Sequence, residues 1–108
     1  MQKNIKVTYL PLFNEDLSKI INYISNILKN EVAATKLLSK IENAINERVP
    51  IADSFATFKS KHNRQNVYYK INVGNFYIFY VIIDKNNTSL VEFRRIIYSK
   101  RNWQNMLD

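Results

Sequence analysis

Three strand-like runs joined by two tight turns fill the last third of this 108-residue chain; they are residues 67–73, 76–83 and 88–97. The first run alternates apolar and polar side chains, and the second is apolar on both faces, as expected for a central strand. Gly74, the only glycine, and Asn75 suit a two-residue hairpin turn, and the polar residues 84–87 make a second turn. The pattern therefore predicts a three-stranded antiparallel meander.

The first half of the chain predicts one strand and two helices. Residues 5–10 alternate and are rich in β-formers, and Pro11 ends that run. Asn14 is a candidate cap for a first helix, and helical spacing of apolar residues resumes after Asn30 in a second helix that ends at Pro50. The link between the two helices is short, so we expect an antiparallel helical hairpin.

Together these elements predict an α+β fold within a single domain, residues 1–108. Residues 50–66 have no clear period and predict a long loop, while residues 99–107 predict a short terminal helix. The order is then β-α-α-β-β-β-α, with an N-terminal strand and a two-helix antiparallel hairpin packed on one face of a mostly antiparallel four-stranded sheet. The other face of that sheet would be free for function.

The positive charge lies mainly in the predicted sheet. Residues 1–54 hold seven Lys/Arg and six Asp/Glu, whereas residues 55–108 hold nine Lys/Arg and three Asp/Glu, out of a net charge of +7. This asymmetry favours an anionic partner for the second half, either nucleic acid or an acidic protein. A surface charge that only aids solubility is the alternative.

Several function classes are disfavoured by composition. The chain has no cysteine, which excludes disulfides and thiolate metal sites, and His62 is its only histidine, which we expect to be a solvated loop residue. No glycine-rich phosphate loop is present, and the longest apolar run, residues 76–83, is too short to cross a bilayer. We expect no metal, no small-molecule cofactor, no membrane contact, no signal peptide and a cytoplasmic location.

Four segments in this order resemble the RelE/ParE superfamily of bacterial type II toxins, also called plasmid-stabilisation proteins. They are Asp16-Leu-Ser-Lys-Ile-Ile-Asn-Tyr-Ile, Ala33-Ala-Thr-Lys-Leu-Leu, Tyr69-Lys-Ile-Asn-Val-Gly-Asn-Phe-Tyr-Ile-Phe-Tyr and Arg95-Ile-Ile-Tyr-Ser-Lys-Arg-Asn-Trp. The resemblance spans residues 6–107 and implies a growth-inhibiting toxin that a cognate acidic antitoxin neutralises. ParE-like members poison DNA gyrase, whereas RelE-like members enter the ribosome and cut mRNA.

For a RelE-like endoribonuclease the resemblance implies four catalytic residues, Lys70, Arg95, Tyr98 and Arg101. Cations would stabilise the charged phosphorane, and a phenol would move protons. Two positions depart from the RelE-like pattern, because Asn72 replaces a second Lys and Tyr77 replaces a strand Arg. This loss of two cations weakens the nuclease interpretation, and the long paired helices and the motif as a whole look more like ParE than RelE. Whether the chain is an enzyme stays open.

The residues expected to bind a target, whether gyrase, ribosome or nucleic acid, are Lys59, Lys61, Arg64, Lys70, Lys100 and Arg101. Each has a plainer interpretation. Lys70 could be an ordinary solvent-facing strand residue, Arg95 could form a half-buried ion pair with a helix carboxylate, and Tyr98 could be a packing aromatic. Arg94 and Arg95 are expected to point to opposite faces of the strand.

The antitoxin is expected on physical grounds as well. A basic sheet with an open edge, beside a helical hairpin groove, can accept an acidic and partly disordered segment that adds a strand or lays down a helix. A third hypothesis, from a different class, is a small basic nucleic-acid-binding module.

Overall fold

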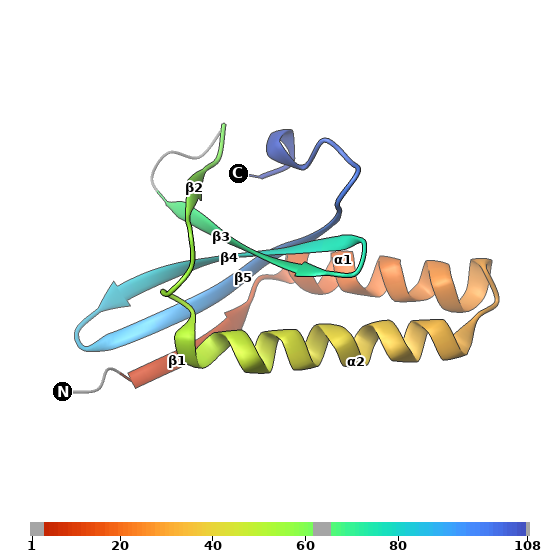
Figure 1. The fold of residues 1–108 in the computed structure, drawn as a ribbon, viewed down its shortest axis with the longest axis horizontal. Coiled ribbons are helices and arrows are strands. Elements are labelled where there is room, and N and C mark those ends of the chain that lie inside the picture. Colours follow the sequence, from red (N-terminus) through yellow and green to blue (C-terminus); the bar gives the residue numbers. More distant parts are fainter. Residues whose placement is uncertain (1–3, 62–65, 108) are drawn as a thin grey trace.

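The computed structural model describes residues 4–61 and 66–107. Figure 1 shows one sheet with two long helices on one side and the C-terminal segment on the other. The helices are α1 (Pro11–Asn22) and α2 (Glu31–Arg48), with a π-helical turn (Tyr23–Ile27) and two 3-10 turns (Val49–Ile51 and Trp103–Asn105). The strands are β1 (Asn4–Tyr9), β2 (Phe58–Lys59), β3 (Val67–Val73), β4 (Phe76–Lys85) and β5 (Thr88–Tyr98).

The predicted α+β architecture is confirmed, with one more strand than the four expected. The sheet order is β1-β5-β4-β3-β2, in which β1 runs parallel to β5 and all other neighbours are antiparallel. The extra strand is β2, two residues inside the predicted loop, which pair with Val67 and Tyr68. A strand of two residues is too short to show an alternation of apolar and polar side chains. Its pairing depends on tertiary contacts, which the sequence pattern does not reveal.

Both predicted hairpin turns contain two residues. Gly74 has a φ of +56° at the first turn position, the geometry of a type II′ turn. At the second turn Asn86 and Asn87 have φ values of 49° and 63°, as a type I′ turn requires, and Asn tolerates that conformation better than most residues.

The break predicted at Asn30 is confirmed, whereas the cap predicted at Asn14 is wrong. Asn30 caps α2, because its side-chain oxygen accepts a hydrogen bond of 3.0 Å from the Ala33 backbone N–H. Asn14 does not cap α1, which already begins at Pro11, directly after Leu10. Proline suits the first turn of a helix, since its φ is preset and its missing N–H would have no partner there.

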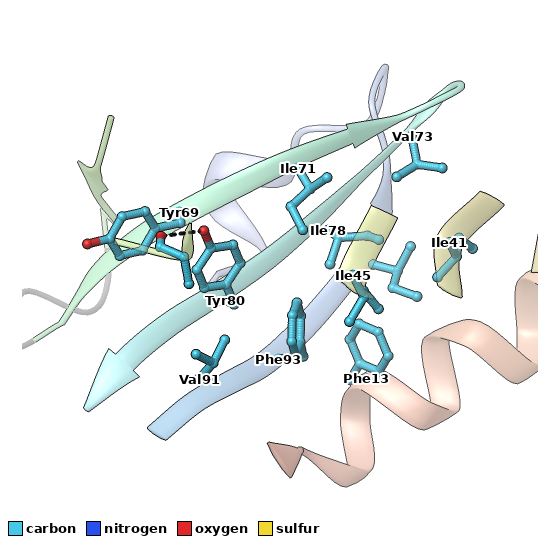
Figure 2. Packing of buried hydrophobic residues seen from close by; sticks show 12 residues of the cluster. Phe13, Ile41, Ile45, Tyr69, Ile71, Val73, Ile78, Tyr80, Val91 and Phe93 are labelled. Atoms are coloured by element: carbon cyan, nitrogen blue, oxygen red, sulfur yellow. Dashed lines mark hydrogen bonds between the residues drawn. The ribbon is translucent and has the colours of Figure 1, made fainter. Parts of the chain in front are cut away.

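The helix-facing side of the sheet holds the larger hydrophobic core. Figure 2 shows Phe13 of α1 and Ile41 and Ile45 of α2 directed at Ile78 and Phe93 of the sheet. The five side chains are at most 5% exposed. This packing buries the apolar stripes of both helices against one face of β4.

The opposite side of the sheet is covered, not free as expected. Phe79 and Val81 of β4 pack there with Leu107, and Phe58 and Trp103 border them. The segment after β5 forms this cover as an irregular tail with the 3-10 turn Trp103–Asn105, in place of the short helix expected over 99–107. The Ser60 hydroxyl, which is buried, donates to the Leu107 carbonyl at 2.9 Å. We call this side the tail-covered face.

A bulge in β5 changes where its two arginines point. The register shifts between Phe79 and Tyr80, so that Phe79 lies opposite Arg95 and Tyr80 opposite Phe93, with Arg94 as the extra residue. Cross-strand partners share a face, so Arg95 lies on the side of Phe79, the tail-covered face. Arg94 bonds to Tyr68 of that same face. The expectation that the two arginines point to opposite faces is therefore wrong.

Arg95 forms the half-buried ion pair that the sequence suggested as its plainer interpretation. Its Nε and Nη2 donate to the two carboxylate oxygens of Asp16 in α1 at 2.7 and 3.1 Å, and its Nη1 donates to the Met106 carbonyl at 3.0 Å. The Asp16 carboxylate also accepts from the Ile96 backbone N–H at 3.0 Å. Helix, strand and tail thus meet at one carboxylate.

We expect Asp16→Asn to destabilise the fold by about 2–3 kcal/mol, because it leaves the Arg95 guanidinium half-buried beside a neutral amide. Glu15→Gln is the matched control, since Glu15 pairs with Lys19 at 3.1 Å on an open surface with side chains 56% and 74% exposed. That exposed pair should contribute no more than about 0.5 kcal/mol. Urea unfolding followed by circular dichroism measures both, and equal losses would contradict the junction's role.

Tyr80 joins the core to the end of α2. Its buried hydroxyl donates to the Ala52 carbonyl at 2.7 Å and accepts from Arg48 Nη1 at 3.1 Å. Burial raises the pKa of the Tyr80 phenol above 10.0, and the negative charge of Asp53 acts in the same direction, while the bond from Arg48 opposes them. The folded chain therefore favours the neutral phenol.

We expect Tyr80→Phe to cost about 1–2 kcal/mol at pH 7, because the Ala52 carbonyl loses its donor. A raised folded pKa means that this contribution is fully present below pH 10 and is lost as the pH rises through the folded pKa. The difference in unfolding free energy between the parent chain and the variant should thus stay constant up to pH 10 and shrink above it. A difference that grew in alkali would show the opposite sign of coupling.

Candidate functional site

Lys70 of β3 is a half-buried cation between two aromatic rings. It lies opposite Phe79, so its side chain is on the tail-covered face. The Lys70 Nζ is 4.2 Å from the ring centroid of Tyr77 and 5.1 Å from that of Trp103. Aromatic faces attract an ammonium group, and no carboxylate of the described residues forms an ion pair with it.

The aromatic rings beneath Lys70 are held by their neighbours. The Trp103 ring centroid is 5.5 Å from Phe58, 5.7 Å from Tyr77 and 5.3 Å from Phe79. Tyr77, which stands where RelE-like nucleases carry a strand arginine, thus serves as packing and as one ring against Lys70. The site presents a positioned cation on a rigid aromatic support.

Two of the predicted target-binding lysines lie beside this support. Lys59 and Lys61 are exposed, and with Ser60, Trp103 and Leu107 they line a shallow pocket of about 210 Å³. We call Lys59, Lys61, Lys70, Tyr77 and Trp103 together the lysine–aromatic surface. Strand β2, which was not predicted, is what brings residues 59 and 61 next to the tail.

Lys100 and Arg101 are exposed in the turn that leads from β5 into the tail. The Arg101 backbone N–H donates to the Tyr98 carbonyl at 3.0 Å, and the Arg101 carbonyl accepts from the Trp103 N–H at 2.8 Å. These bonds fix the backbone and leave both side chains open to solvent, two and three residues ahead of Trp103. Arg64 and His62 lie outside the described residues.

The four residues proposed for RNA cleavage do not converge. Tyr98 pairs with Phe76, and the two rings meet edge to face at 5.8 Å on the helix-facing side of the sheet, whereas Lys70 is on the tail-covered face. The Arg95 guanidinium donates hydrogen bonds to the Asp16 carboxylate and to the Met106 carbonyl of the tail. Lys70 and Arg101 alone keep their cations available.

Arg94 resembles Arg95 in being held by the fold. It donates to Glu92 at 3.0 Å and to the Tyr68 hydroxyl at 3.3 Å. Burial disfavours its charged form, but the bonds with Tyr68 and Glu92 outweigh that cost and raise the pKa of Arg94.

One cation near Lys70 was missed at the sequence level. The Arg48 guanidinium, at the end of α2, lies 3.4 Å from the Phe55 ring centroid and donates to the Lys70 carbonyl at 3.3 Å. A basic residue just before Pro50 could have been noted, but it also fits the usual preference for cations at helix C-termini.

Among the described residues, no group of three or more His, Cys, Asp or Glu side chains could hold a metal ion. In the same part of the chain, no helix is both long and apolar enough to span a membrane.

Comparison with known proteins agrees with the fold described above. Residues 7–103 match the family described as the ParE toxin of the type II toxin-antitoxin system, parDE. A solved structure described as the chromosomal ParDE TA system from P. aeruginosa contains a chain of similar fold, with a TM-score of 0.63. The two chains are 12% identical, and the alignment covers 89% of this chain and 97% of that chain. No curated protein sequence matches significantly. From the family match over nearly its whole length, the chain belongs to the ParE toxin family of type II toxin-antitoxin systems.

Proposed function

We propose that this chain inhibits bacterial growth by poisoning DNA gyrase and is held inactive by a cognate antitoxin. Family membership supports a toxin, and one structural observation favours gyrase over mRNA as its target. Lys70 and Tyr98 lie on opposite faces of the sheet, and Arg95 is committed to Asp16. In-line cleavage of RNA needs a proton-transfer group and phosphate-binding cations around one phosphodiester.

The lysine–aromatic surface suits binding better than chemistry. Its lysines provide attraction for an anionic surface, while Trp103 and Tyr77 provide flat area that loses little conformational freedom on binding. A complex of gyrase with DNA offers phosphates and acidic side chains together. We therefore place the contact with the target on this surface.

The antitoxin is proposed to occupy the other side of the molecule. Strand β1 is an edge strand whose side chains Ile5, Val7 and Tyr9 are 40–46% exposed. Next to it, Tyr9, Phe13, Leu38 and Ile45 contribute to a groove of about 390 Å³ between α1 and α2. An extended segment can pair with the edge, and an amphipathic helix can fill the groove.

The gyrase proposal predicts that the exposed lysines matter by position and not only by charge. We expect the double variant Lys59→Gln/Lys61→Gln to need about 5–10 times more protein to inhibit gyrase supercoiling, because two charges leave the binding surface. Lys36→Gln/Lys40→Gln is the matched control, since it removes two lysines of α2 that are also exposed. It should inhibit like the parent chain.

The supercoiling assay is run beside in vitro translation, with accumulation of gyrase-cleaved DNA as the positive signal. Cleavage of ribosome-bound mRNA that disappears in Lys70→Ala would instead support the RelE-like endoribonuclease. Retention of any nucleic acid without inhibition of either system would support the basic binding module, and would remove the gyrase proposal.

The antitoxin proposal predicts that β1 is required for complex formation. We expect the acidic protein encoded by the adjacent gene to co-purify with this chain, and Val7→Asp to weaken the complex at least about tenfold by placing a charge on the shared apolar edge. Val32→Asp is the control, because Val32 is 67% exposed at the far end of the helical hairpin. Equal loss in both variants would argue against β1 as the docking edge.

A further inference from the structure

Part of β3 has an open edge. Pairing with β2 involves only Val67 and Tyr68, so within the described part of the chain residues 70–73 have a strand neighbour, β4, on one side only. The two-residue turn makes Val73 and Phe76 a hydrogen-bonded pair, and the ladder alternates from there. The backbone groups of Ile71 therefore point to β4, whereas those of Lys70 and Asn72 point outward.

The Lys70 carbonyl supports this orientation, because it accepts a hydrogen bond from Arg48 beyond the edge. Among the described residues, no hydrogen bond engages the outward N–H of Lys70 or the outward N–H and C=O of Asn72, so these groups can pair with a neighbouring strand. Open edges of this kind are templates for an added strand.

A pocket of about 550 Å³ lies along the same edge, and it carries two cations and no acid. Its lining comprises Arg48, Phe55, Ala56, Thr57, Phe58, Lys70, Ile71 and Asn72. The Phe55 ring and the Tyr80 hydroxyl hold Arg48 in place. Its Nη1 is the donor in both side-chain bonds, so within the described part of the chain Nε and Nη2 have no protein acceptor. Such a preoriented guanidinium is suited to a carboxylate.

The two cations lie on opposite faces of the sheet. Arg48 reaches the edge from the helix-facing side, where Tyr80 is packed, while the Lys70 side chain is on the tail-covered face. Successive side chains of an added strand also point to opposite faces. Two adjacent acidic residues in such a strand would each meet one cation, whereas acids separated by one residue would both face the same side.

We propose that the open edge of β3 binds an acidic peptide segment in extended conformation, with adjacent carboxylates contacting Arg48 and Lys70. A peptide fits better than a nucleic acid strand, because the edge offers backbone donors and acceptors spaced for another β-strand. Identifying this segment as part of the antitoxin rests on the function proposed above, whereas the peptide-binding site does not depend on that function. It would be a contact separate from the one on β1.

The test uses the purified chain and fluorescein-labelled octapeptides of Thr, Val and two Glu residues. One peptide has the two Glu residues adjacent at its centre, and its control has the same composition with one Thr between them. Anisotropy titration should give binding about fivefold tighter for the adjacent pair, since only it engages both cations. A third peptide, N-methylated at alternate backbone nitrogens, should lose binding because it cannot pair with the edge.

Variants of the chain assign the contacts. Arg48→Gln and Lys70→Gln should each weaken the adjacent-Glu peptide about tenfold and remove its preference over the control peptide. Lys36→Gln, an exposed charge change on α2, should leave both intact. Thermal unfolding checks that each variant is folded. If Arg48→Gln unfolds, Lys70→Gln still tests the site, because the Lys70 side chain donates no hydrogen bond to the described residues.

Equal affinity for the two Glu arrangements, or binding that N-methylation leaves unchanged, would overturn the proposal. Tighter binding of octauridylate, lost in the same two variants, would reassign the pocket to nucleic acid. The titration needs neither gyrase nor antitoxin. A chain that binds the peptide but fails to inhibit gyrase would therefore refute the proposed toxin mechanism and leave this site standing, and the converse result would refute the site alone.

Discussion

The Asp16 carboxylate is the point on which the three layers of the molecule depend. The pairing of β1 with β5 ends at Tyr9 and Phe93, and beyond it the Asp16 carboxylate accepts a hydrogen bond from the Ile96 N–H of β5. The same carboxylate holds Arg95, whose third bond fixes the Met106 carbonyl of the tail. Apart from this link, the described part of the tail is held on the sheet by apolar contacts, the Ser60 bond to Leu107 and the bond from the Ser99 N–H to the Asn75 carbonyl. Because Trp103 belongs to that tail, a junction on one edge of the sheet also sets the support beneath Lys70.

The cations on and beside the sheet differ in the groups that hold them. Arg94 and Arg95 form ion pairs with Glu92 and Asp16, so their charges are neutralised within the fold. Lys70 and Arg48 are held instead by aromatic rings, hydroxyl and carbonyl groups, which orient a cation without cancelling it. A cation kept in place but left uncompensated is poised for an external anion, because most of the cost of ordering it has already been met. The high positive charge of the second half therefore overstates the number of cations available to a partner.

How much could be predicted from sequence follows from the range of the interactions. Local signals predicted the two long helices, the two turns and the long strands: Gly74 and Asn86-Asn87 specify turn geometry, and Asn30 marks the break between the helices. The strand β2, the bulge at Arg94 and the path of the tail depend on packing between residues far apart in the chain, such as Phe58 with Trp103. The bulge alone moves Arg95 to the other face of the sheet, which no count of alternating residues could reveal. The sequence therefore predicted which residues are candidates for the site, but not which face of the sheet each of them lies on.

That partition bears directly on chemistry. A catalytic group contributes only when it reaches the reacting atoms, and a separation by the thickness of a sheet removes Tyr98 from any reaction at Lys70. Asn72 and Tyr77 add no cation beside Lys70, and the Tyr77 ring instead contacts the Lys70 ammonium group. The same separation is no obstacle to binding, because an extended segment lying along an edge contacts both faces at once. Arg48 and Lys70 thus face opposite sides of one open strand. This arrangement is poorly suited to cleaving a phosphodiester and well suited to binding an extended peptide.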